Sequence, residues 1–340
     1  MSTAPTPNAP RRRPKSHLIV TVAALILAGV LLYFSLRGID WAKVYALLRH
    51  ADPMRVGVTC VLFTTSLFLR AYRWRVLLLS QGHVSIPTAF WATAAGYFGN
   101  NFLPARAGEV ARTLMISAQS GMSRTCVLTM AMLERIADAI ALVVISALVL
   151  LVIPDPPAWL ARTAKPFGIA GLCSVLVIAL LPRLERWGTL MLQRMPVPAG
   201  FRDKLIAMLG QILEGMRSFH DARRLIAFVG LTVVIWTIDA AGTVIGGSSL
   251  GLTIPFPVAF LLIAGLGLGS ALPSTPGYVG IYQFVAVSVL TPFGFSKTDA
   301  IAYILLAQAI SYLLVGFWGT IGLMRYRRSG GRLHTEAAQS

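Results

Sequence analysis

Long uninterrupted runs of apolar residues are the feature that most constrains how this chain can fold. A helix needs about 20 residues, at 1.5 Å per residue, to cross the hydrocarbon core of a bilayer. Of the 340 residues, 56% are hydrophobic and 13% are charged, whereas about a quarter of a soluble domain is charged. We therefore predict an all-α integral membrane protein with about 6–8 transmembrane segments. The clear spans are His17–Leu36, Met54–Leu79, Cys126–Ile153, Leu225–Ser249 and Ala300–Met324.

Three shorter apolar stretches complete this pattern. Phe167–Leu181 is bounded by Pro166 and Pro182, and at about 15 residues it is a short or partial span. Ala89–Leu103 and Ala259–Leu272 are rich in glycine, and a proline follows each of them. Because proline interrupts a helix, we expect these two stretches to be half-helices of re-entrant loops.

Basic residues predict the orientation of the chain. It carries 30 basic and 13 acidic residues, a formal net charge of +17, and the cytoplasmic loops of membrane proteins are enriched in Lys and Arg. This rule accounts for the excess of positive charge, so nucleic acid is not an expected partner. The basic segments 1–16 and 325–340 place both termini in the cytoplasm, with residues 17–324 as one multi-pass domain of the cytoplasmic membrane. The segment Arg37–Pro53 is an exception, because it carries basic residues on the predicted outer side.

The stretch between the two halves has the spacing of an amphipathic helix. Over residues 201–222 apolar side chains recur at helical intervals, and charged residues lie off that face. Two interpretations stay open for this predicted cytoplasmic helix: a gate next to the lipid, and a plain interfacial connector.

Similar motifs occur in the same order in both halves. Leu103–Gly108 (LPARAG) matches Leu272–Gly277 (LPSTPG), and the offset between Pro104 and Pro273 is half the length of the chain. Ser123–Thr125 and Ser296–Thr298 are related by nearly the same offset, and each precedes a long closing helix. A chance match in a Leu- and Gly-rich chain is the alternative to a duplication.

We favour the duplication, with repeats at about residues 54–153 and 225–324. The predicted topology lets the first break enter from the cytoplasm and the second from outside, so the repeats are inverted. Inverted repeats with broken helices are typical of transporters, because exchanging the conformations of the two halves exposes one site to either side.

The first break concentrates positive charge. Pro104 ends a helix and Gly108 permits a tight turn, so Arg106 and Arg112 lie where free backbone N–H groups also point. Guanidinium groups bind phosphates in a bidentate manner, which predicts an anionic headgroup here. We expect Glu109 to pair with Arg112. Snorkelling of both arginines to the inner interface is the alternative.

Further ionisable residues lie inside predicted spans. Glu134, Arg135 and Asp138 share one span, and Asp239 lies in the middle of another. Because such residues are costly in a bilayer unless they pair or line a wet cavity, we expect them to face the interior and to form a charge network with Glu109. Glu134, Arg135 and Asp138 could either pair with one another to stabilise the fold or form a functional site. Asp239 is protonated, paired across the bundle, or coupled to a proton.

Three arginines lie near the predicted cytoplasmic end of the second span. We expect Arg70, Arg73 and Arg75 to snorkel to phosphate headgroups. Arg70 is the deepest of them, so we predict it as a headgroup ligand and as the partner of Glu109 or Asp138.

The second break offers hydroxyl and amide groups in place of charges. The headgroup ligands predicted on this side are Ser274, Thr275, Tyr278 and Gln283. Together with the first break, the predicted helix-breaking residues are Pro104, Gly108, Pro273, Pro276 and Gly277.

No motif in the chain indicates an enzyme site. The five histidines are scattered over span ends, loops and the tail, and no Gly-rich loop ends in Lys-Ser or Lys-Thr. Cys60, Cys126 and Cys173 lack metal-ligand spacing. We therefore predict no catalysis, no cofactor and no metal.

Three strings resemble the membrane region of the lysylphosphatidylglycerol synthases and of related flippase-like proteins: Asn101–Arg112, Glu134–Asp138 and Leu272–Gly277. The resemblance runs from about His17 to Met324 and implies a protein that moves or handles lipids. Aminoacyl transfer is not implied, because the synthases carry a soluble domain for it after the membrane region. Where the family often has an Arg in its second closing helix, this chain has Gln308.

The leading hypothesis is a lipid translocase for an anionic, glyco- or hopanoid-type lipid. The charge network would change partners between its two states. A second hypothesis is a non-transporting scaffold that binds a lipid-biosynthesis enzyme through residues 202–219. A third is an intramembrane glycosyl or aminoacyl transferase. The expected partners are membrane lipids, and the sequence leaves the oligomeric state open.

Overall fold

The computed structural model describes residues 15–103, 107–153, 221–270 and 276–337, together with isolated positions between 162 and 173. Within these ranges the regular structure is helical. The long helices are α1 (Lys15–Leu36), α3 (Pro53–Leu78), α6 (Arg124–Val152), α9 (Ala222–Ser249) and α12 (Lys297–Ala337). The short helices are α2 (Trp41–Arg49), α4 (Ile86–Phe102), α5 (Ala107–Ser120), α10 (Phe256–Gly269) and α11 (Ile281–Leu290), with 3-10 turns η3 (Pro276–Tyr278) and η4 (Thr291–Phe293).

Four of the described helices, α3, α6, α9 and α12, are long and apolar enough to cross a membrane. The end of α1 and the whole of α2, bent by 87° relative to each other, would make a fifth span. The prediction of an all-α, multi-pass membrane protein is therefore confirmed. The predicted span Phe167–Leu181, apart from a few isolated positions, and the amphipathic stretch 201–222, apart from its last two residues, lie outside the described residues.

The same capping arrangement begins α3 and α9. The carboxylate of Asp52 accepts hydrogen bonds from the first turn of α3, and Asp221 caps α9 in the same way. Each cap also pairs with an arginine three residues later, Arg55 at 3.3 Å and Arg224 at 3.4 Å. Both the caps and their arginines are related by the offset that separates Pro104 from Pro273. Helices α3 and α9 therefore have the register expected from the repeat.

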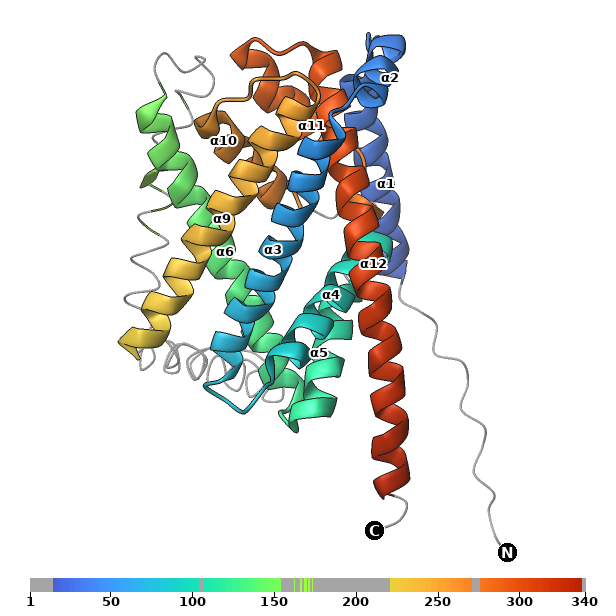
Figure 1. Cartoon of the computed structure of the whole chain (residues 1–340), viewed down its shortest axis with the longest axis vertical. Helices are drawn as coiled ribbons and strands as arrows, with labels where there is room; N and C mark the ends of the chain where they lie inside the picture. The colour runs from blue at the N-terminus through green and yellow to red at the C-terminus, as the bar shows by residue number, and fades with distance from the viewer. Residues whose placement is uncertain are drawn as a thin grey trace, which may run out of the picture.

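Equivalent helices of the two repeats run in opposite directions (Figure 1). In that view α3 descends while α9 rises, and α6 rises while α12 descends. The broken pair α4–α5 lies in the lower half of the bundle, and α10–α11 lies in the upper half. These directions are the ones expected of two inverted repeats, each with an interrupted helix pair.

The two repeats interlock. Between the repeats, α3 packs along α9, α4 of the first repeat packs on α12, and α10 of the second packs on α6. Contact between α4 and α12 is close, since a Cβ on Gly322 would lie 2.8 Å from the carbonyl oxygen of Trp91. One apolar core surrounds each broken pair, with Trp74 in the lower one and Leu262 in the upper one.

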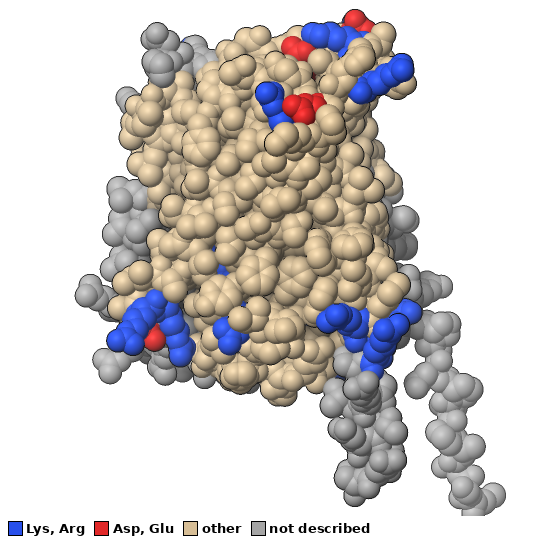
Figure 2. Space-filling view, in the orientation of Figure 1, with Lys and Arg blue, Asp and Glu red and all other residues tan. Residues whose placement is uncertain are grey.

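The two ends of the bundle differ in charge (Figure 2). The lower end carries separate groups of basic residues, at the start of α9 and along α12, and one of these arginines, Arg224, pairs with Asp221. At the upper end, acids neutralise part of the basic charge: Lys43 pairs with Asp299 at 2.8 Å, and Arg55 pairs with Asp52. The arginines of the lower end include Arg223, Arg224, Arg325, Arg327 and Arg328.

Candidate functional site

The first predicted break lies between α4 and α5. Helix α4 ends at Phe102 and α5 begins at Ala107, while Pro104 and Arg106 lie outside the described residues. Gly108 is the second residue of α5, and a Cβ there would collide with the carbonyl oxygen of Gly96. Glycine is therefore required at this position because α4 and α5 approach closely, rather than for the predicted tight turn.

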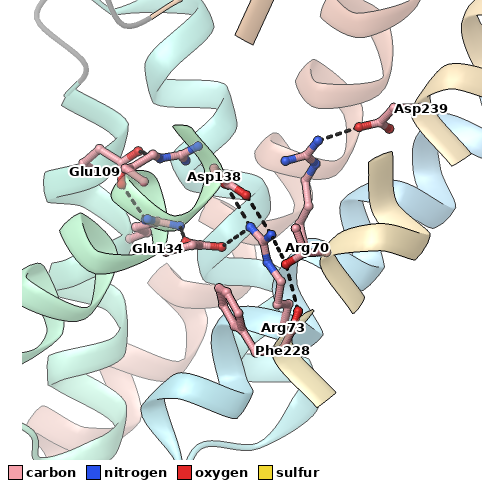
Figure 3. Close-up of polar contacts among 10 residues, drawn as sticks. Arg70, Arg73, Glu109, Glu134, Asp138, Phe228 and Asp239 are labelled. Carbon is pink, nitrogen blue, oxygen red and sulfur yellow. Dashed lines mark hydrogen bonds and ion pairs between the residues drawn. The ribbon is translucent and has the colours of Figure 1, made fainter. Parts of the chain in front are cut away.

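Arg73 of α3 lies at the centre of a buried charge cluster beside this break (Figure 3). Its guanidinium is fully buried and pairs with Asp138 at 2.7 Å and with Glu134 at 3.2 Å, both on α6. It also donates a hydrogen bond of 2.9 Å to the hydroxyl of Thr232 on α9. The prediction that Arg73 snorkels to headgroups is wrong, because three acceptors from two other helices hold it inside the bundle.

Arg112 extends the cluster toward the break. It pairs with Glu134 at 3.0 Å and with Glu109 at 2.7 Å, which confirms the predicted Glu109–Arg112 pair. Its guanidinium carbon lies 4.3 Å from the centre of the Trp74 ring, a cation–π geometry. The Nη2 atom of this side chain, which is 2% exposed, has no hydrogen-bond partner among the described residues.

Glu109 joins the cluster to its more exposed end. Besides Arg112 it pairs with Arg135 at 3.0 Å and accepts a hydrogen bond of 3.3 Å from the amide of Asn100. The side chain of Arg135 is 34% exposed, far more than those of Arg73 and Arg112. The cluster therefore has a buried end at Arg73 and an accessible end at Arg135.

The six charges of this cluster balance. Three arginines face three carboxylates, and Glu109 and Glu134 each bridge two arginines. Pairing of this kind lets ionised groups remain inside a membrane bundle, where an isolated charge costs several kcal/mol. The cluster consists of Arg73, Glu109, Arg112, Glu134, Arg135 and Asp138.

A separate ion pair connects the two repeats. Arg70 of α3 and Asp239 of α9 approach to 2.5 Å, with side chains 14% and 19% exposed. The guanidinium carbon of Arg70 lies 4.7 Å from the centre of the Trp236 ring. Of the three states that the sequence left open for Asp239, pairing across the bundle is the one found. Arg70 thus pairs with Asp239, and neither of its predicted partners, Glu109 and Asp138, forms an ion pair with it.

The second break, between α10 and α11, has neutral hydrogen bonds. Gly277 has a φ of 71°, and its carbonyl oxygen accepts hydrogen bonds from Gln308 at 3.0 Å and from Tyr312 at 2.5 Å. Gln283 donates to Gln308 at 2.5 Å and accepts from the backbone N–H of Gly280 at 2.8 Å. Gln283, predicted as a headgroup ligand, is therefore engaged in holding the break together.

Of the other ligands and helix-breaking residues predicted at the second break, the structure describes Tyr278 and Pro276. Tyr278 stacks on Tyr282 with ring centres 5.0 Å apart. Pro276 begins η3, directly before Gly277. Pro273, Ser274 and Thr275 lie outside the described residues.

Sequence reasoning missed the central role of Arg73. One signal was available, because Arg70 and Arg73 are three residues apart and share a helix face. Once Arg70 is expected to face the interior, Arg73 must face it as well. The sequence did not reveal that Thr232 and Asp138, far away in the chain, supply its acceptors.

Comparison with known proteins gives relatives of two kinds. The chain is 25% identical over 317 residues to glycosyltransferase AglD of Haloferax volcanii, covering 82% of this chain and 50% of that protein. It spans about half the length of this relative. It is also 25% identical over 339 residues to a UPF0104 membrane protein of Pyrococcus horikoshii, covering 92% of this chain and 98% of the relative. A UPF0104 membrane protein of Methanothermobacter thermautotrophicus is 21% identical over 300 residues, covering 82% of this chain and 85% of that protein.

The family comparison covers nearly all of the membrane domain. Residues 21–319 match the family described as the lysylphosphatidylglycerol synthase TM region. This range includes both broken helices, the buried cluster and the Arg70–Asp239 pair. The chain therefore belongs to the family of the lysylphosphatidylglycerol synthase TM region.

Proposed function

We propose that this protein is a lipid translocase that moves an anionic headgroup across the membrane by way of its first helix break. The observation that carries the proposal is the buried guanidinium of Arg112, which has an N–H donor without a hydrogen-bond partner among the described residues and lies beside an interrupted helix. Phosphate oxygens are strong acceptors for such donors. Two inverted repeats supply the architecture, because alternating access uses the exchange of conformation between such halves.

The headgroup would compete with Glu109 for its arginines. Glu109 holds both Arg112 and Arg135, the second of which is the accessible end of the cluster. A phosphate that enters from this end can pair with both arginines in place of the carboxylate. Since the cluster is neutral before the lipid binds, the carboxylate must then find another partner or a proton. This change of partners would link binding to the change of state.

The basic end of the bundle favours an orientation. The lower end carries the arginines at the start of α9 together with Arg325, Arg327 and Arg328 of α12. By the positive-inside rule this end faces the cytoplasm. The first break would then open to the cytoplasmic leaflet and the second to the outer one, with the acyl chains remaining in lipid.

Reconstitution tests the proposal. In vesicles that contain fluorescent phosphatidylglycerol, the purified protein should speed movement of the probe between leaflets, measured by dithionite quenching. Arg106→Ala and Arg112→Gln should abolish this movement while the protein stays monodisperse. Arg223→Ala, on an exposed arginine outside the cluster, serves as the control. If Arg106→Ala moves the probe at the unchanged rate, Arg106 is not part of the headgroup site. The assay is then repeated with the lipids that co-purify with the protein, identified by mass spectrometry.

Glycosyl transfer is the second candidate, because one relative is named a glycosyltransferase. This reaction would need an acid or base free to act on a bound donor. In the charge cluster beside the first break the carboxylates Glu109, Glu134 and Asp138 are all ion-paired to arginine. Incubation with a polyprenyl-phosphate sugar and a lipid acceptor that carries a free hydroxyl distinguishes the two candidates. A translocase returns the donor and the acceptor unchanged, whereas a transferase moves the sugar to the hydroxyl and releases polyprenyl phosphate.

A further inference from the structure

The Arg70–Asp239 ion pair joins equivalent positions of the two repeats. Arg70 and Asp239 are separated by an offset of 169 along the chain, the same offset as between the capping residues Asp52 and Asp221. Each therefore lies equally far along the chain from the cap of its own helix. The Arg70–Asp239 ion pair thus joins two residues that are equivalent by the repeat.

A contact between equivalent positions marks the symmetry axis. A two-fold rotation places the equivalent of each residue on the opposite side of the axis, at the same distance from it. Two equivalent residues can therefore touch only where both lie next to the axis. The helices α3 and α9 are antiparallel, because the backbone N–H of Asp52 donates to the carbonyl of Ser249 at one end and Arg73 contacts Thr232 toward the other. Arg70 and Asp239 meet between these contacts.

The charge cluster around Arg73 does not obey this symmetry. At the offset that relates Arg70 to Asp239, the equivalent of Arg73 is Gly242. At the offset that relates Ser123 to Ser296, before α6 and α12, the equivalents of Glu134 and Asp138 are Ala307 and Ser311. When the repeats exchange conformations, the cluster cannot be rebuilt in the second repeat. The Arg70–Asp239 contact, by contrast, is transformed into itself.

We propose that Arg70 and Asp239 form the pivot about which α3 and α9 turn during translocation. This inference rests on the proposed function. The pair holds the two repeats in register and stays closed in both states, while contacts away from the axis change. Arg70 and Asp239 are thus positioning residues, and the headgroup need not touch them.

Cross-linking tests the pivot. In a background that lacks Cys60, Cys126 and Cys173, the variant Arg70→Cys/Asp239→Cys is linked with a reducible bifunctional thiol reagent. Phosphatidylglycerol movement is measured before linking, after linking and after reduction. We expect the linked protein to retain most of its activity. A loss on linking that is restored by reduction would overturn the pivot.

The matched control links the same two helices away from the axis. A Cβ on Gly246 would lie 3.5 Å from Thr59, which makes Thr59→Cys/Gly246→Cys a suitable pair. Linking this pair should stop lipid movement reversibly. If it leaves movement unchanged, α3 and α9 do not turn relative to each other, and the pivot is excluded.

A charge exchange gives a second, independent test. Arg70→Asp brings two carboxylates together and should reduce lipid movement by about tenfold or more. Because the two positions are equivalent, Arg70→Asp/Asp239→Arg should restore most of it. A double variant that is folded but as slow as the single one would contradict the inference. If the unmodified protein moves no probe at all, the proposed function fails. The pivot fails if the unmodified protein is active but linking Arg70→Cys/Asp239→Cys stops lipid movement, or if Arg70→Asp/Asp239→Arg does not restore it.

Discussion

The two helix breaks use the same framework with different chemistry. In the first repeat Glu109, just after the break, pairs at 3.0 Å with Arg135 on the closing helix α6. In the second repeat Gln283, just after the break, donates at 2.5 Å to Gln308 on the closing helix α12. Both pairs join the short helix after the break to the helix that closes the repeat. The fold therefore requires a contact between the short helix and the closing helix in both repeats. Only in the first repeat is this contact an ion pair.

The glycines at the two breaks make the same point. Gly108 and Gly277 occupy the same place in the LP motifs of the two halves, yet the structure needs glycine at each for a different reason. At Gly108 a side chain would strike the α4 backbone. At Gly277 the φ of 71° places the residue in the left-handed region. The shared motif therefore preserves an interruption of the helix, and each half achieves it with its own geometry.

Replacing Arg73 should have the largest effect on the charged break. Arg73→Leu leaves Glu134 and Asp138 without their shared cation, and removing one partner from a buried ion pair costs about 3–5 kcal/mol. We expect the free energy of unfolding, from detergent titration in bicelles, to fall by this amount. Arg223→Leu, on an exposed arginine, is the control. A loss no greater than that of the control would mean that the cluster adds nothing to stability.

Transferring the charge to the neutral break should have an intermediate effect. Gln308→Arg places a buried cation where the described acceptors that Gln308 itself uses, the carbonyl of Gly277 and the hydroxyl of Tyr312, are neutral. We expect the free energy of unfolding to fall by about 1–3 kcal/mol. Adding Gln283→Glu recreates the pair of the first repeat and should recover at least part of the loss. If the double variant is less stable than Gln308→Arg, the two breaks do not share a framework.

Removing the helix caps should have the smallest effect, and an equal one in both repeats. Asp52→Ala and Asp221→Ala each remove the acceptor for the first turn of a long helix, which costs about 1 kcal/mol. Asp52→Asn and Asp221→Asn keep an acceptor and should cost much less. Unfolding measured in the same bicelles checks both positions. A large difference between them would show that the N-termini of α3 and α9 are not equivalent.

The fold could be predicted further than the site. Apolar runs of about 20 residues can form little besides membrane helices, and the LP motifs marked both breaks. Glu109–Arg112 could be predicted because the pair is local, three residues apart on one helix. Arg70–Asp239 and Arg73–Asp138 could not, because their partners depend on which helix faces which. That choice is decided by packing between α3, α6 and α9, about which the spacing within one helix says nothing.

The interlocking of α4 with α12 and of α10 with α6 has a consequence for how such a protein arises. A chain with only one repeat would have an uncovered face on its broken pair and another on its closing helix. It could cover both only by meeting an identical chain inserted upside down in the same bilayer. An ancestor of half this length would therefore have been made in both orientations at once, and fusion of two copies would have fixed one of each.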